Sequence, residues 1–156
     1  MNLDLMKAMR ASISEVLETM FFEPLEFPEE MDASGFLDKN KKHSIAVSVK
    51  YRGPFSGDLS CFMPKNLALF LASDFLGVEP SEVSDNQAEE VVKEIVNMAA
   101  GGVFSHYDNS AVFQLGIPEA INDKRKTEGD CCGSEDVCLL LADTVNGRFA
   151  LKLRVM

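Results

Sequence analysis

The stretch that decides the fold is SDNQAEEVVKEIVNMAAGGVFSH, residues 84–106. Its apolar side chains recur at the spacing of an α-helix, which gathers them on one face. Ser84 is followed three positions later by Gln87, a capping-box pattern that satisfies free backbone N–H groups where a helix begins. The sequence therefore predicts one long helix whose buried face consists of Ala88, Val92, Ile95, Val96, Ala99 and Val103.

The opposite face of this predicted helix carries Glu90, Glu94, Asn97 and Gly101. No bulky side chain lies among them, so a partner could approach the backbone near Gly101 while it meets Glu94 and Asn97 side by side. Carboxylates one turn apart on an exposed helix are usually only solvated, and no serine or cysteine stands near a histidine at a spacing typical of nucleophilic catalysis. The chemistry that remains is an amide beside a carboxylate, and we expect this face to be the active site.

The run Glu94-Ile95-Val96-Asn97-Met98-Ala99-Ala100-Gly101, followed by Leu115-Gly116-Ile117-Pro118, resembles the CheX/CheC/FliY family of chemotaxis phosphatases. The shared signature is a glutamate, two spacers, an asparagine and a downstream proline. The resemblance implies that the protein removes the phosphoryl group from the aspartate of a CheY-type response regulator. It also implies that Asn97 positions the attacking water, while Glu94 orients the docked regulator by meeting its active-site lysine.

An asparagine amide suits this role because it donates and accepts hydrogen bonds at the same time. Placement and electrostatics do most of the work in phosphoryl transfer, so holding a water in line with phosphorus is a sufficient task. The resemblance implies that the regulator brings the acyl phosphate and its Mg²⁺, so we expect no cofactor and no metal site in this chain. We therefore assign catalysis to Glu94 and Asn97, and partner binding to Glu90, Gly101 and Pro118.

The alternative is a noncatalytic adaptor or dimerisation module of the same fold, which would bind a signalling partner without hydrolysis. Substitution of Asn97 separates the phosphatase from the adaptor. It would lower the dephosphorylation rate of a phosphatase, whereas an adaptor has no such rate and would keep its binding. The sequence does not identify which response regulator is bound.

Composition limits the classes of partner. At 156 residues, with 46% hydrophobic and 26% charged residues, the chain is predicted to fold as one domain, residues 1–156. A net charge of −10 argues against nucleic acid and anionic membranes as partners, since both present phosphate. The first ten residues lack the pattern of a signal peptide, and no stretch approaches the roughly 20 apolar residues of a membrane span. We expect a cytoplasmic protein.

The four cysteines are predicted to be reduced thiols. Cys131 and Cys132 are adjacent, and neighbouring cysteines seldom form a relaxed disulfide with each other. With only two histidines in the chain and no paired Cys-x-x-Cys, metal binding by the thiols is not expected. The role of Cys131 and Cys132 stays open; the other two cysteines are Cys61 and Cys138.

The rest of the chain predicts an α+β fold, a mostly antiparallel sheet with two long helices packed on one face, the CheC-like arrangement that the resemblance implies. Helical spacing marks residues 2–22 and 64–77, whereas 24–42 and 122–134 are predicted to be irregular. Asn146-Gly147 is predicted to form a type I′ hairpin turn. Strands are predicted at 45–51, 57–63, 111–117 (ending at Pro118), 137–141 and 149–155.

A homodimer is also expected. The resemblance implies it, because the family commonly pairs sheets edge to edge, and the final predicted strand, Arg148 to Val155, would offer an open edge. In the competing interpretation this strand is interior, with Lys152 and Arg154 facing solvent.

Overall fold

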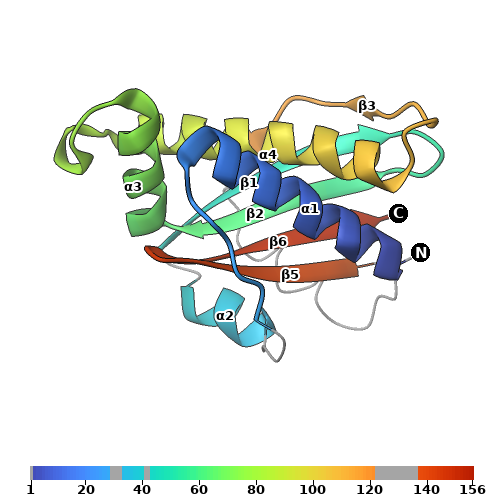
Figure 1. Cartoon of the computed structure of the whole chain (residues 1–156), viewed down its shortest axis with the longest axis horizontal. Coiled ribbons are helices and arrows are strands. Elements are labelled where there is room, and N and C mark those ends of the chain that lie inside the picture. Colours follow the sequence, from blue (N-terminus) through green and yellow to red (C-terminus); the bar gives the residue numbers. More distant parts are fainter. Residues whose placement is uncertain (1, 29–32, 41–42, 122–136) are drawn as a thin grey trace.

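The computed structural model of the chain describes residues 2–28, 33–40, 43–121 and 137–156. Two long helices lie side by side over one face of an antiparallel sheet, and a third helix stands at one end (Figure 1). The predicted fold class is therefore confirmed. The elements are α1 (Asn2–Phe21), α2 (Ala33–Asn40), β1 (Ser44–Arg52), β2 (Gly57–Pro64), α3 (Lys65–Leu76), η1 (Pro80–Glu82), α4 (Asp85–Tyr107), β3 (Gln114–Leu115), β4 (Glu119–Ala120), β5 (Val137–Thr144) and β6 (Gly147–Val155).

The strand order is β3-β1-β2-β6-β5, and β4 pairs with β1 beside β3. The last strand, β6, lies between β2 and β5, with Leu151 opposite both Cys61 and Leu140. The prediction that Arg148 to Val155 forms an open edge is therefore wrong. The competing interpretation is correct about the interior position but not about Lys152, which is only 3% exposed.

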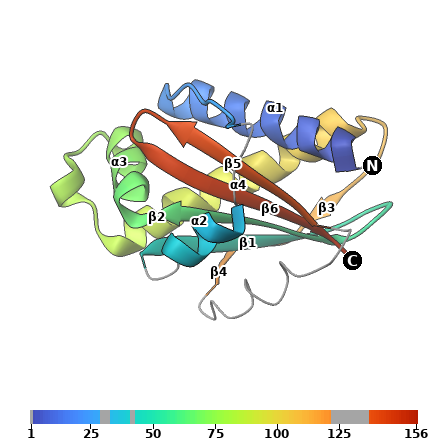
Figure 2. The same cartoon turned by 90° about the horizontal axis from the view of Figure 1, so that it is seen from below.

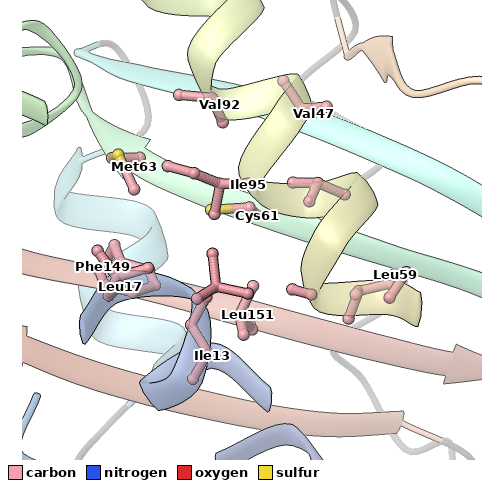
Figure 3. Close-up of a cluster of buried hydrophobic side chains, with 14 of the residues drawn as sticks. Ile13, Leu17, Val47, Leu59, Cys61, Met63, Val92, Ile95, Phe149 and Leu151 are labelled. Atoms are coloured by element: carbon pink, nitrogen blue, oxygen red, sulfur yellow. The ribbon is translucent and has the colours of Figure 1, made fainter. Parts of the chain in front are cut away.

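The core lies between the sheet and the pair α1 and α4. Ile13 and Leu17 of α1 and Ile95 of α4 point toward the strands, where they meet apolar side chains of β2 and β6 (Figure 3). All three are fully buried. Since burying a side chain of this size contributes about 1.5–3 kcal/mol, this layer holds both helices firmly on the sheet.

The opposite face of the sheet carries α2, which was not expected (Figure 2). Phe36 and Leu37 of α2 pack against a small second cluster that includes Phe62 of β2. The prediction that residues 24–42 are irregular is wrong for Ala33–Asn40. An eight-residue helix that contains a glycine has too few turns to show a helical period in the sequence.

The predicted strand at 111–117 is also corrected. Within 111–117, only Gln114–Leu115 pairs with β1. Pairing does not end at Pro118, because a second short strand, Glu119–Ala120, follows it and also pairs with β1. Pro118 has no N–H to donate, so it can interrupt the ladder between the two short strands.

The β5–β6 hairpin is confirmed, but not its predicted turn. Thr144 pairs with Gly147, so the turn residues are Val145 and Asn146 rather than Asn146 and Gly147. Among the described non-glycine residues only Phe22 has a positive φ, whereas a type I′ turn requires positive φ at both central positions. The Thr144 hydroxyl instead bridges this turn by accepting from Asn146 N (3.0 Å) and donating to Gly147 O (3.0 Å). The predicted loop at 122–134 lies outside the described residues.

Candidate functional site

The helix that carries the candidate residues begins as predicted. Ser84 Oγ accepts from Gln87 N (3.1 Å), and Ser84 N donates to Gln87 Oε1 (2.9 Å), so both halves of the capping box form. All six residues of the predicted apolar arc are fully buried. The buried face is wider than predicted, since it also includes Val91, Ala100 and Phe104.

The candidate residues lie on the solvent side of α4. Glu90, Glu94 and Gly101 are exposed, and Asn97 is half-buried. Glu90 accepts from Lys93 Nζ at 3.2 Å, so its charge is partly balanced within the helix. By contrast, the side chains of Glu94 and Asn97 form no hydrogen bond or ion pair with any residue that the structure describes. One carboxylate and one amide, nearly one turn apart, are therefore available to an outside molecule.

Two adjacent glycines in α4 have different roles. A Cβ added at Gly101 would meet nothing within 4 Å, so this position is open to solvent. A Cβ added at Gly102 would lie 2.3 Å from Ser12 Oγ of α1, so only glycine allows the two helices to approach this closely. Neither glycine ends the helix, which continues to Tyr107. Gly102 thus allows α1 to pack closely against α4, while Gly101 is exposed on the outer face, where the sequence predicts that a partner approaches.

Beyond Gly101, the outer face of α4 runs into an open depression of about 190 Å³. This depression could not be identified from the sequence, because its walls come from the end of α4 and from the segment that returns to the sheet. Phe104 of α4 and Phe113 stack at its base with ring centroids 4.2 Å apart. The depression is lined by Gly101, Phe104, Ser105, Asp108, Asn109, Ala111, Phe113 and Leu115.

Asp108 places a fixed negative charge at the rim of this depression. Its carboxylate accepts from the hydroxyl of Ser110 at 2.6 Å and from the backbone N of Ser110 at 3.0 Å. These hydrogen bonds hold the pKa of Asp108 below its usual value, because they stabilise the charged form. The depression therefore has an apolar base and an acidic rim.

Buried aromatic side chains support this end of α4. Tyr51 of β1 lies 4.5 Å from Phe104, centroid to centroid, and its hydroxyl donates to Arg154 O at 2.9 Å. Burial raises the pKa of Tyr51 above its usual value, so the phenol stays neutral. At the surface nearby, His106 Nε2 lies 3.0 Å from Glu15 Oε2 and joins α4 to α1. The outer face of α4 is thus presented on a rigid base.

Pro118 is the one predicted site residue that is not on α4. It is half-buried between β3 and β4, and both of these strands contact α4. The structure therefore places Pro118 on a segment adjacent to α4, with no hydrogen bond in the described part of the chain that joins it to Glu94 or Asn97.

The described cysteines lie in the core, and the described residues contain no cluster suited to a metal ion. Cys61 and Cys138 are buried thiols outside any disulfide, and burial raises the pKa of Cys61 to about 12 and that of Cys138 above its usual value. Within the same residues, no group of three or more His, Cys, Asp or Glu side chains is arranged to hold a metal ion. Cys131 and Cys132 lie outside the described residues. The helices that the structure describes include none long and apolar enough to cross a membrane.

Comparison with solved structures gives the same fold over nearly the whole chain. CheX of Vibrio vulnificus is 18% identical, with a TM-score of 0.72 over 97% of this chain and 96% of that one. CheX of Desulfovibrio desulfuricans is 16% identical, with a TM-score of 0.69 over 97% and 99%. A CheX–CheY–BeF3–Mg²⁺ complex from Borrelia burgdorferi contains a chain that is 19% identical, with a TM-score of 0.66 over 97% of each.

Sequence comparison identifies the family. No curated protein matches the chain. The family model described as chemotaxis phosphatase CheX matches residues 45–142, which is more than half of the chain and includes Glu94, Asn97, Gly101 and Pro118. The protein therefore belongs to the CheX family of chemotaxis phosphatases.

Proposed function

We propose that this protein hydrolyses the phospho-aspartate of a CheY-type response regulator, with Asn97 positioning the attacking water and Glu94 orienting the docked regulator. The proposal rests on one observation, which is that the side chains of Glu94 and Asn97 are available to a partner. Both project from the outer face of a capped, tightly packed helix, and neither is engaged by any described residue of the chain. Membership of the CheX family, and the complex of a related CheX with CheY, support a regulator as the partner.

The proposed reaction needs little from this chain beyond placement. The Asn97 amide oxygen accepts a hydrogen bond from a water, and the amide N–H₂ can donate to a phosphoryl oxygen, so the water is held in line with phosphorus. The water oxygen forms a bond to phosphorus as the bond to the aspartyl carboxylate oxygen breaks. The products are inorganic phosphate and the free aspartate. Mg²⁺ enters with the regulator as part of the substrate and balances charge on the phosphoryl group.

Glu94 is proposed to act through docking. A lysine ammonium of the regulator that meets the unpaired Glu94 carboxylate would fix the angle at which Asn97 enters the regulator's active site. The net charge of −10 favours a partner surface that is basic around that lysine. Glu90, which is already paired with Lys93, would add to this acidic face, while Gly101 leaves room for the approaching backbone. Pro118 would contact the regulator from the neighbouring segment.

We also propose that the protein acts in the cytoplasm as a homodimer. The edge expected from the sequence is not available, since β6 is interior. The outermost long strand is β5, whose outer side is bridged at Asp143 by Glu26 in the described part of the chain. Edge-to-edge pairing would therefore involve β5.

The experiment that tests the function is an assay of acyl-phosphate loss. Purified CheY-type regulators are phosphorylated, freed of excess donor, and followed with and without this protein at saturating Mg²⁺. A catalytic protein accelerates the loss at substoichiometric concentration. Binding of the phosphorylated regulator without acceleration would instead establish the noncatalytic adaptor.

A further inference from the structure

Exposed apolar side chains gather at the end of the molecule away from the depression beside Gly101. The described part of the chain has ten large hydrophobic residues that are well exposed, and six of them belong to the C-terminal end of α1, the C-terminal end of α3 with the residues just after each helix, or the β5–β6 hairpin. Figures 1 and 2 both show these three segments at the same end. The six residues, here called the apolar end, are Met20, Phe22, Phe75, Leu76, Val78 and Val145.

Two contacts join these segments. The Phe21 ring lies 5.7 Å from that of Phe75, centroid to centroid, which connects α1 to α3. Asn146 Nδ2 of the hairpin donates to Glu23 Oε1 at 2.9 Å, immediately after Phe22. The C-terminal end of α1 therefore contacts both α3 and the β5–β6 hairpin, so the apolar end is formed by neighbouring segments.

Phe22 has an unfavourable backbone conformation, although its side chain is exposed to solvent. It is 87% exposed and has a φ of 55°, the position after a helix that glycine usually occupies. Glu23 N donates to Leu17 O at 3.0 Å, which is the backbone hydrogen bond of such a helix end. Ending the helix requires the positive φ but does not require a phenyl ring there. A non-glycine residue in this conformation is unfavourable by about 1 kcal/mol. Burial of the Phe22 ring does not offset this free energy, because the ring is in solvent.

The surroundings of the apolar end are acidic. Glu18 on α1, Asp74 on α3, and Glu79 and Glu82 in the following segment are exposed, and none of them pairs with a described cation. Glu23 adds a fifth carboxylate that is 6% exposed, and its Oε2 has no hydrogen-bond donor. A second copy of this chain would bring like charges together, and an anionic membrane would be repelled.

We propose that the apolar end is a docking surface for a basic amphipathic segment of another protein. Apolar side chains of that segment would cover Phe22, Phe75 and Val78, while its lysine and arginine side chains would meet the surrounding carboxylates. This surface lies near the start of α4, whereas Asn97 and the depression beyond Gly101 lie further along the helix (Figure 1). Occupancy of the apolar end therefore leaves the proposed phosphatase face accessible.

The test uses a fluorescein-labelled 18-residue amphipathic peptide of leucine and lysine as the probe, and a leucine–glutamate peptide of the same pattern as its control. Fluorescence anisotropy with the full chain gives the affinity. The surface variant is Phe22→Ser with Val78→Ser. Its matched control is Leu3→Ser, which removes a 71% exposed side chain at the opposite end of α1. For charge, Glu79→Lys is compared with Asp4→Lys, because both change the net charge equally.

We expect the leucine–lysine peptide to bind and the leucine–glutamate peptide not to bind. Phe22→Ser with Val78→Ser should weaken binding about tenfold or more, since central apolar contacts dominate such interfaces, while Leu3→Ser should leave it unchanged. Glu79→Lys should weaken binding more than Asp4→Lys does. Regulator dephosphorylation should be unaffected by Phe22→Ser with Val78→Ser, so the outcome is independent of the proposed function.

Three outcomes would overturn the proposal. Equal affinities of the surface variant and Leu3→Ser would show that the peptide binds by general charge attraction. Absence of binding by the leucine–lysine peptide would show that the surface does not select this chemistry. A dimeric chain that becomes monomeric in Phe22→Ser with Val78→Ser would show that the apolar end binds a second copy instead.

Discussion

The hydroxyl oxygen of Ser12 occupies the space in which any residue other than glycine at position 102 would place its Cβ. A Cβ built on Gly102 would lie 2.3 Å from Ser12 Oγ. The same hydroxyl donates a 2.7 Å hydrogen bond to the carbonyl oxygen of Ala99 and is buried. α1 is therefore fixed against the buried side of α4 one residue after Gly101, which faces solvent.

This relationship predicts opposite effects for two neighbouring substitutions. Gly102→Ala should lower the free energy of unfolding by about 1–3 kcal/mol, because the methyl group must displace a buried, hydrogen-bonded serine. Gly101→Ala should raise it by about 0.5–1 kcal/mol, because alanine favours the helix and the added methyl group meets nothing. Urea unfolding of both variants measures the difference. Stabilisation by both substitutions would show that the two helices are not packed as described.

A second prediction concerns docking. Glu94→Lys should weaken binding of the phosphorylated regulator about tenfold or more at low ionic strength, because it places a cation against the expected lysine, and added salt should reduce the effect. Titration calorimetry with a regulator that carries BeF3 and Mg²⁺ in place of the phosphoryl group gives the affinity, because this form is not hydrolysed. Glu18→Lys on α1 is the control, since it changes the net charge equally at another exposed position. If both variants lose the same affinity, Glu94 has no specific contact.

The pH dependence of the rate distinguishes water positioning from general-base catalysis. If Asn97 only orients water, no group on this protein changes protonation during the reaction, and the rate should be nearly flat with pH after correction for the regulator's own hydrolysis. If Glu94 is the base, the rate should fall as its carboxylate is protonated, and Glu94→Gln should be as damaging as Asn97→Ala. A pH series on the wild type and both variants makes the comparison. An acidic fall that disappears in Glu94→Gln would assign the chemistry to Glu94.

The proposed homodimer predicts a mass of two chains by light scattering at micromolar concentration. If the β5 edge forms the contact, Leu139→Pro, which removes a backbone donor from that half-buried edge position, should favour the monomer. Circular dichroism checks that the variant keeps its fold. A wild-type chain that is monomeric throughout this range would contradict the prediction.

Long periodic segments were predictable from the sequence because their own side chains determine which face is buried. The helix with the Ser84 cap and the strands predicted at 45–51 and 57–63, which are β1 and β2, were confirmed. The order of strands was not predictable, since the same alternation in β6 fits an edge or an interior strand. Its interior position follows from pairing with β5 in the hairpin and, on the other side, with β2, where Cys61 and Leu151 are 90 positions apart.

The candidate pair Glu94 and Asn97 was identified from spacing and family resemblance, and the structure places both on the outer face. The depression beyond Gly101 could not be predicted, because Phe113 reaches Phe104 only through the turn after α4. The turn after β5 was predicted wrongly since Asn-Gly is a strong local signal, while pairing of Thr144 with Gly147 placed the turn one residue earlier. Tertiary pairing thus overrode the local preference at this position.

The most direct test of the account is the dephosphorylation rate of Asn97→Ala. The side chain is half-buried on the outer face and forms no hydrogen bond with the described residues, so the free energy of unfolding should change by less than about 0.5 kcal/mol. With the fold and regulator binding retained, the variant should accelerate loss of the acyl phosphate hardly at all above the regulator's own rate. Dephosphorylation at the wild-type rate by a folded Asn97→Ala protein would contradict the proposed role of Asn97.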